Sequence, residues 1–114
     1  MILISKERWK EFSKRLLPIL DRLEFALATH GPNYSEEMRK LTQRAQEDPQ
    51  QFVFDVHDGF LWGGMGSVFD GASHPETMQA LLDLAEALKS EGLDTDRTNL
   101  AASFLRKALE MKKK

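Results

Sequence analysis

The chain has 114 residues and a formal net charge of −2, and 41% of its residues are hydrophobic. Its length suits one domain, residues 1–114, that buries roughly 65% of its unfolded surface. Because the sequence contains no cysteine, it excludes disulfides, thiolate zinc sites and a thiol nucleophile. The first residues lack the long apolar core of a secretory signal, and no apolar run approaches the ~18 residues of a membrane span. We therefore expect a soluble, cytoplasmic protein.

The first part of the chain predicts two helices. Apolar residues recur at steps of three and four over residues 5–30, which is typical of one amphipathic helix. Pro18 falls inside this pattern and predicts a kink. A Gly-Pro pair ends the first helix, and Asn33 with Glu36 three residues later forms a capping box. The second helix is therefore expected over about residues 35–47.

Residues 49–62 allow two interpretations. Asp48 followed by proline is a helix start signal, and the segment is longer than a typical strand. The run 51–58, however, alternates well enough to form a strand. We favour a largely buried helix, and the strand stays the alternative for 51–58.

A glycine-rich turn follows near the middle of the sequence, with Gly63, Gly64 and Gly66 among four residues. Glycines can line up backbone donors around a phosphate, but the lysine of a phosphate loop is absent here. The favoured interpretation is a tight corner between helices. Gly63 or Gly64 then ends one helix in the left-handed conformation, and Ser67 caps a short helix with Asp70 as its capping-box partner.

Two more helices are predicted after this corner, over residues 75–91 and 96–112. A Ser-His-Pro-Glu run starts the first, Gly92 ends it, and Thr95 can cap the second. The apolar face of the helix over residues 96–112 is expected to comprise Leu100, Ala101, Phe104, Leu105, Ala108 and Met111. The predicted fold class is all-α, a compact single-domain bundle of five to six helices with a glycine-rich central turn.

Charge is unevenly distributed along the chain. Residues 45–88 contain no Lys or Arg and eight acids: Glu47, Asp48, Asp55, Asp58, Asp70, Glu76, Asp83 and Glu86. In one interpretation these acids cap helices and solvate exposed faces. In the other they form an anionic surface for a basic protein partner, which would repel nucleic acid. Both interpretations stay open.

Catalytic and metal-binding patterns are absent from the sequence. Asp55, His57, Asp58, Asp70 and His74 are candidate ligands or acid–base groups, but none of them has the spacing of a known histidine metal motif. Helix capping already explains the serines near His74. We therefore expect no enzyme activity, no metal and no cofactor. An enzyme that uses His57 or His74 with the nearby carboxylates is an alternative.

The segment 61–70, Leu-Trp-Gly-Gly-Met-Gly-Ser-Val-Phe-Asp, resembles a motif of small uncharacterised bacterial all-helical proteins. In that family an aromatic residue precedes Gly-Gly-Met-Gly-Ser, and an acidic or amide residue follows near the start of a short helix. Trp62 stands where that family commonly has Phe. Some members resemble immunity proteins of polymorphic or type VI secretion toxins. The resemblance implies a stand-alone cytoplasmic domain that neutralises a toxin.

The resemblance and the acidic interval together predict an immunity-type protein that binds a basic toxin domain through an acidic central surface. The expected contact residues are Asp55, Asp58, Trp62, Met65 and Asp70. Trp62 has two interpretations, a core residue or an interface anchor. The alternative function is a structural or adaptor domain that self-associates through the aromatic stretch 52–62. No nucleic acid or membrane partner is expected.

Overall fold

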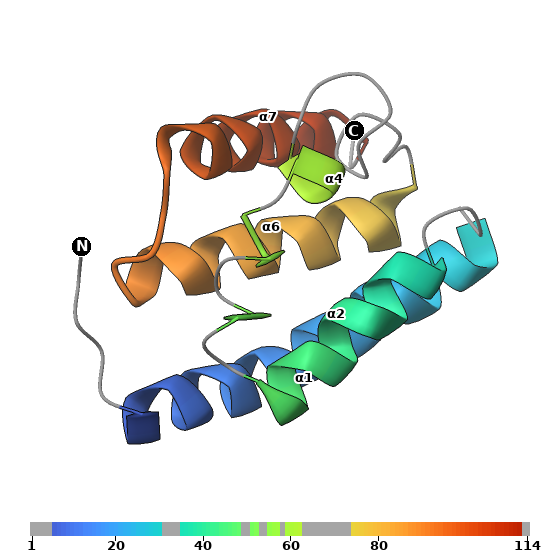
Figure 1. Ribbon diagram of the computed structural model, residues 1–114. Coiled ribbons are helices and arrows are strands. Elements are labelled where there is room, and N and C mark those ends of the chain that lie inside the picture. The colour runs from blue at the N-terminus through green and yellow to red at the C-terminus, as the bar shows by residue number, and fades with distance from the viewer. Residues whose placement is uncertain are drawn as a thin grey trace.

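The computed structural model describes residues 6–30, 35–48, 51–52, 55–57, 59–62 and 74–112. Five helical elements lie in these ranges: α1 (Lys6–His30), α2 (Ser35–Glu47), α4 (Gly59–Trp62), α6 (Pro75–Ser90) and α7 (Asp96–Lys112). Four of them are long and α4 is a single turn, as Figure 1 shows. No strand occurs in the described ranges. The predicted all-α class is confirmed.

The bounds of the long helices agree closely with the prediction. The number of five to six helices is not confirmed and stays a prediction. The glycine-rich turn with Gly63, Gly64, Gly66 and Ser67, and the short helix after it, lie outside the described residues. Among the residues that the structure describes, no helix is long and apolar enough to cross a membrane.

The segment after α2 is helical where it is described. Gln51, Phe52 and Asp55 are in helical conformation. The Phe52 amide donates to the Asp48 carbonyl and the Val56 amide donates to the Phe52 carbonyl, both four residues back. The strand alternative for 51–58 is therefore wrong for these residues.

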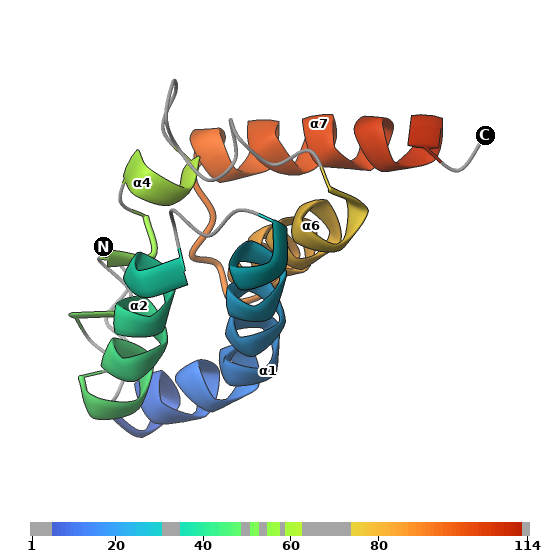
Figure 2. The same cartoon turned by 90° about the vertical axis from the view of Figure 1, so that its right-hand side faces the viewer.

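The long helices pack in a chain of neighbours: α2 lies against α1, α1 against α6, and α6 against α7. Figures 1 and 2 show α6 in the middle, with α1 and α2 on one side of it and α7 on the other. α4 also contacts α7. α6 is thus covered from two sides, whereas α7 is an edge helix.

One continuous core joins these helices. α1 contributes the predicted stripe, which includes Phe12, Leu16, Leu20, Leu23 and Leu27. α6 buries residues on both of its packed sides: Thr77, Met78, Ala80, Leu81, Leu82, Leu84, Ala85 and Leu88. Pro18 lies inside α1 as predicted, and the ribbon of α1 changes direction along its length (Figure 2).

The ends of α6 and α7 follow the local signals of the sequence. The His74 side chain caps α6 by accepting from the Glu76 amide through Nδ1 at 3.2 Å. Gly92 ends α6 with φ of 73°, the left-handed conformation that glycine adopts without a Cβ clash. Thr95 and Thr98 cap α7 reciprocally, because each backbone amide donates to the hydroxyl of the other, at 2.8 and 3.2 Å.

Candidate functional site

The structure describes two of the five predicted contact residues. Asp55 lies on the surface after α2, and Trp62 is the last residue of α4. Asp58, Met65 and Asp70 lie outside the described residues. The described part of the candidate site therefore comprises Asp55 with its neighbours and the surroundings of Trp62.

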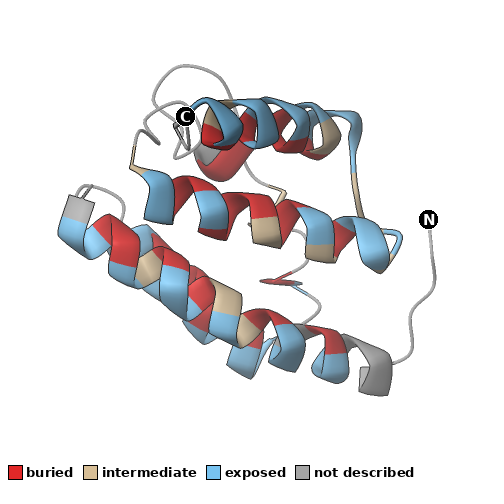
Figure 3. Ribbon diagram, turned by 180° about the vertical axis from the view of Figure 1, so that it is seen from behind, coloured by how far each residue is buried: buried red, intermediate tan, exposed pale blue. Residues whose placement is uncertain are grey.

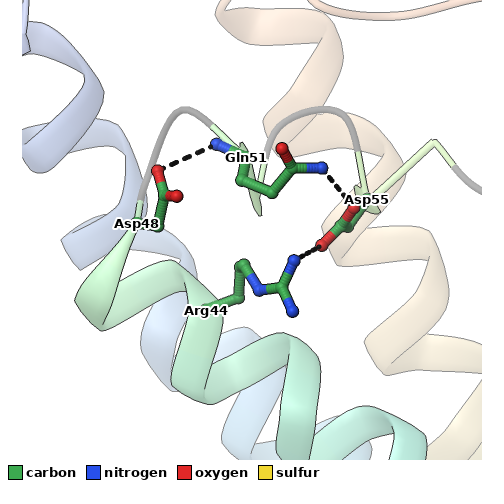
Figure 4. Close-up of polar contacts among 4 residues, drawn as sticks. All are labelled: Arg44, Asp48, Gln51 and Asp55. Carbon is green, nitrogen blue, oxygen red and sulfur yellow. Dashed lines mark hydrogen bonds and ion pairs between the residues drawn. The ribbon is translucent and has the colours of Figure 1, made fainter.

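Asp55 is held by two side chains that approach from different elements (Figure 4). Arg44, in the last turn of α2, places Nη1 3.0 Å from Oδ2 of Asp55, and Gln51 donates from Nε2 to Oδ1 at 3.0 Å. The Asp48 carboxylate accepts a hydrogen bond from the backbone amide of Gln51 at 3.3 Å, as its predicted capping role requires. Both oxygens of Asp55 are thus fixed in direction.

These groups make a small acidic corner, which we define as Glu47, Asp48 and Asp55 around Arg44. Glu47 is exposed, and its carboxylate accepts a hydrogen bond from the side-chain amide of Gln43 at 3.2 Å. The corner holds three carboxylates and one guanidinium, which pairs with Asp55, so it carries a net negative charge at neutral pH. The Asp55 side chain is 30% exposed and the Arg44 side chain is 47% exposed, so a partner can reach both.

Two acidic residues of α6, and Glu91 directly after it, form ion pairs within the chain. Arginines of α1 and α7 supply the cations: Arg22 for Asp83, Arg106 for Glu86, and Arg15 for Glu91. The first two pairs have N–O distances of 2.7 and 3.2 Å. They tie α6 to α1 and to α7. Part of the charge separation seen along the sequence therefore serves contacts between helices.

Trp62 lies in the core. Its side chain is 3% exposed, and the indole Nε1–H donates to the Val56 carbonyl at 2.8 Å. Phe52, Val56 and Leu61 are fully buried beside it in the same cluster. Trp62 is therefore a core residue, and the self-association predicted for the stretch 52–62 stays a prediction.

His57 connects the same segment to the turn between α6 and α7. Burial lowers the pKa of His57 below its usual range, and a hydrogen bond with the Leu93 backbone opposes this effect in part. Nδ1 of His57 is buried and has no hydrogen-bond partner among the described residues. The neutral imidazole is therefore favoured near pH 7. This gives His57 a structural contact; His74, the other candidate base, caps α6.

Metal-binding geometry is absent from the described ranges, where no three His, Cys, Asp or Glu side chains are grouped to hold an ion. A pocket of about 430 Å³, which the sequence did not indicate, opens between α1 and α6. Its lining residues are Asp21, Arg22, Phe25, Glu76 and Gln79. Because residues from two helices must come together to form it, no local signal could have predicted this pocket.

Comparisons with family models, with curated proteins and with solved structures found no match to the chain. The resemblance of residues 61–70 to a bacterial immunity-type family therefore stays an expectation.

Proposed function

We propose that this protein is a non-enzymatic, cytoplasmic binding domain that neutralises a basic protein partner, the toxin that the resemblance of residues 61–70 implies. The acidic corner forms part of the binding surface. Asp58, Met65 and Asp70 remain the predicted contacts beyond it. Trp62 supports the surface from the core and does not touch the partner.

The observation that carries the proposal is the fixed orientation of the Asp55 carboxylate. Arg44 and Gln51 hold it before any partner arrives, so binding costs less side-chain entropy than it would for a freely rotating acid. Glu47 and Asp48 add negative charge at the same place. Such a patch accelerates encounter with a basic groove and contributes specificity through complementary charge.

The proposed surface is narrower than the acidic interval of the sequence. Asp83 and Glu86 pair with arginines of α1 and α7, so they serve contacts between the long helices. Asp48 also has a capping role. The charges to remove in a test are therefore those of Glu47 and Asp55, together with the predicted contact Asp58.

The proposal predicts a toxin gene next to the gene of this protein. The test is a triple variant, Glu47→Gln, Asp55→Asn and Asp58→Asn, assayed against the purified product of that gene. Because exposed charges contribute up to about 1 kcal/mol each, we expect binding to weaken roughly tenfold and to become less sensitive to salt. Isothermal titration at two salt concentrations measures both effects, and survival of toxin-expressing cells measures neutralisation.

A matched control removes the same charge elsewhere. Glu11→Gln, Glu36→Gln and Glu37→Gln change three exposed acids of α1 and α2 outside the acidic interval. This control should bind within about twofold of the unchanged protein. Full protection by the first triple variant, or an equal loss in both variants, contradicts the acidic-corner proposal.

A further inference from the structure

Large exposed hydrophobic side chains gather on one helix. Among the described residues four are strongly exposed: Phe25 at 69%, Leu100 at 74%, Phe104 at 61% and Met111 at 76%. Three of these four belong to α7. Scattered exposed apolar residues are ordinary, but three large ones on a single helix form a patch that calls for an explanation.

The spacing of these residues places them on one face of α7. Leu100, Phe104 and Met111 are separated by four and seven residues, so they form a stripe along the helix, with Lys107 between the last two. We call these four residues the α7 stripe. The opposite face packs into the core through Thr98, Ala101, Ala102, Leu105 and Leu109. Figure 3 shows this division as buried and exposed colours on α7.

We propose that the α7 stripe binds the α7 stripe of a second copy of this chain. The two helices pack antiparallel, about a twofold axis that passes near residues 101 and 102. This surface is distinct from the acidic corner, so the inference is independent of the proposed function.

Charge on one edge of the α7 stripe indicates that its binding partner is a second copy of the chain. Asp96 and Lys107 are eleven residues apart, about three helical turns, and so lie along the same edge of α7. Both are exposed. In an antiparallel pair related by a twofold axis, the same edges of the two helices face each other. Asp96 of one copy then meets Lys107 of the other when the axis passes midway between them, at residues 101–102.

Two of the three apolar residues fit nearly the same axis. Leu100 and Phe104 have their midpoint at residue 102, so each Leu100 packs beside Phe104 of the other copy in that register. A parallel pair would place the same edges on opposite sides of the contact and residues of equal number at the same height, so Asp96 of one copy would not meet Lys107 of the other. One antiparallel register therefore pairs Asp96 with Lys107 and Leu100 with Phe104, while Met111 lies opposite residues 92–93, before the start of α7.

The size of the stripe determines the strength of the contact. α7 has 17 residues and is about 25 Å long. A single pair of helices of this length buries less than the roughly 1,200 Å² of a stable interface, so the dimer belongs to the weak class. The homodimer must therefore be sought at high protein concentration.

Sedimentation equilibrium from about 10 µM to about 1 mM covers the range of a weak dimer. We expect the mass to rise with concentration from the 13.0 kDa of one chain toward twice that value. Leu100→Gln with Phe104→Gln should stay monomeric throughout. Phe25→Gln removes an equally exposed aromatic side chain from α1 and should leave the dimer unchanged.

Charge reversal tests the register. Asp96→Lys or Lys107→Glu alone should weaken the dimer at least fivefold, and the double reversal should restore it to within about twofold. If a reversal unfolds the chain, as judged by circular dichroism, Asp96→Asn and Lys107→Gln replace it, and each should weaken the dimer about twofold or more.

Three results would overturn the proposal. The first is a monomer at about 1 mM, and the second is failure of the double reversal to restore association. The third is binding to vesicles of phosphatidylserine and phosphatidylcholine by a chain that stays monomeric, because the stripe would then serve an anionic membrane surface.

Discussion

α6 and α7 lie side by side and have similar lengths, but they differ in how they are covered. α6 packs against α1 on one side and α7 on the other, whereas α7 packs against α6 and α4 and leaves a whole face exposed. The acids of α6 are drawn into ion pairs with α1 and α7, while α7 keeps large apolar residues in contact with solvent. Position in the fold thus separates a supporting helix from one available for binding.

The largest expected effect comes from truncating one leucine in each helix. Leu84 of α6 is fully buried and Leu100 of α7 is 74% exposed. Leu84→Ala should lower the free energy of unfolding by about 2–5 kcal/mol, and Leu100→Ala by no more than about 0.5 kcal/mol. Urea unfolding of the monomer at low concentration measures both. Equal losses would break the comparison.

The cap of α7 gives the next effect. Thr98 is buried and exchanges hydrogen bonds with Thr95 at the start of the helix. Thr98→Val keeps the shape and removes the hydroxyl, so we expect a loss of about 1–2 kcal/mol in unfolding free energy. Ser103→Ala, at an exposed position of the same helix, serves as control and should change it by less than about 0.5 kcal/mol. A Thr98 variant as stable as this control would show that the cap contributes little.

The ion pairs on the two sides of α6 should differ in their contributions to the free energy of unfolding, by a smaller amount. The Arg22–Asp83 pair is shorter and its carboxylate is less exposed than that of the Arg106–Glu86 pair. Arg22→Gln should therefore cost more than Arg106→Gln, within the range of about 0.2–1 kcal/mol for exposed pairs. Thermal unfolding at low and high salt measures the difference, which salt should reduce. The reverse order would contradict the described geometry.

The smallest effect is a dependence on pH at the connection between α6 and α7. Because burial lowers the pKa of His57 in the folded chain, the unfolded chain binds a proton more readily. The contribution of His57 to stability is complete above its unfolded pKa of about 6.5 and is lost as the pH falls toward the lower folded value. His57→Gln should reduce the slope of the unfolding free energy against pH between about pH 7 and 5. A slope unchanged by this substitution would exclude His57 as its cause.

The features that the sequence predicted well depend on local signals. Thr95 marks the start of α7, Gly92 the end of α6 and His74 its beginning, because capping involves residues only a few positions apart. The helical form of Gln51 and Phe52 was likewise indicated by Asp48, whose carboxylate accepts from the backbone amide of Gln51.

The features that sequence reasoning missed depend on contacts between distant residues. Arg22 and Asp83 are 61 positions apart, so the pairing of the acidic interval could not be read without the fold. The predicted single apolar face of α7 combined Leu100 and Phe104 with Ala101 and Leu105, which the structure divides between solvent and core. For Trp62, composition allowed both a core and a surface position.

The most direct measurement is a comparison of ¹H–¹⁵N spectra at about 20 µM and about 1 mM, a range that spans a weak dimer. Dimerisation through the α7 stripe predicts concentration-dependent shifts at Leu100, Phe104 and Lys107 of α7, and none at Leu81 or Leu84 of α6. Spectra that do not change, or changes centred on the stretch 52–62, would contradict it.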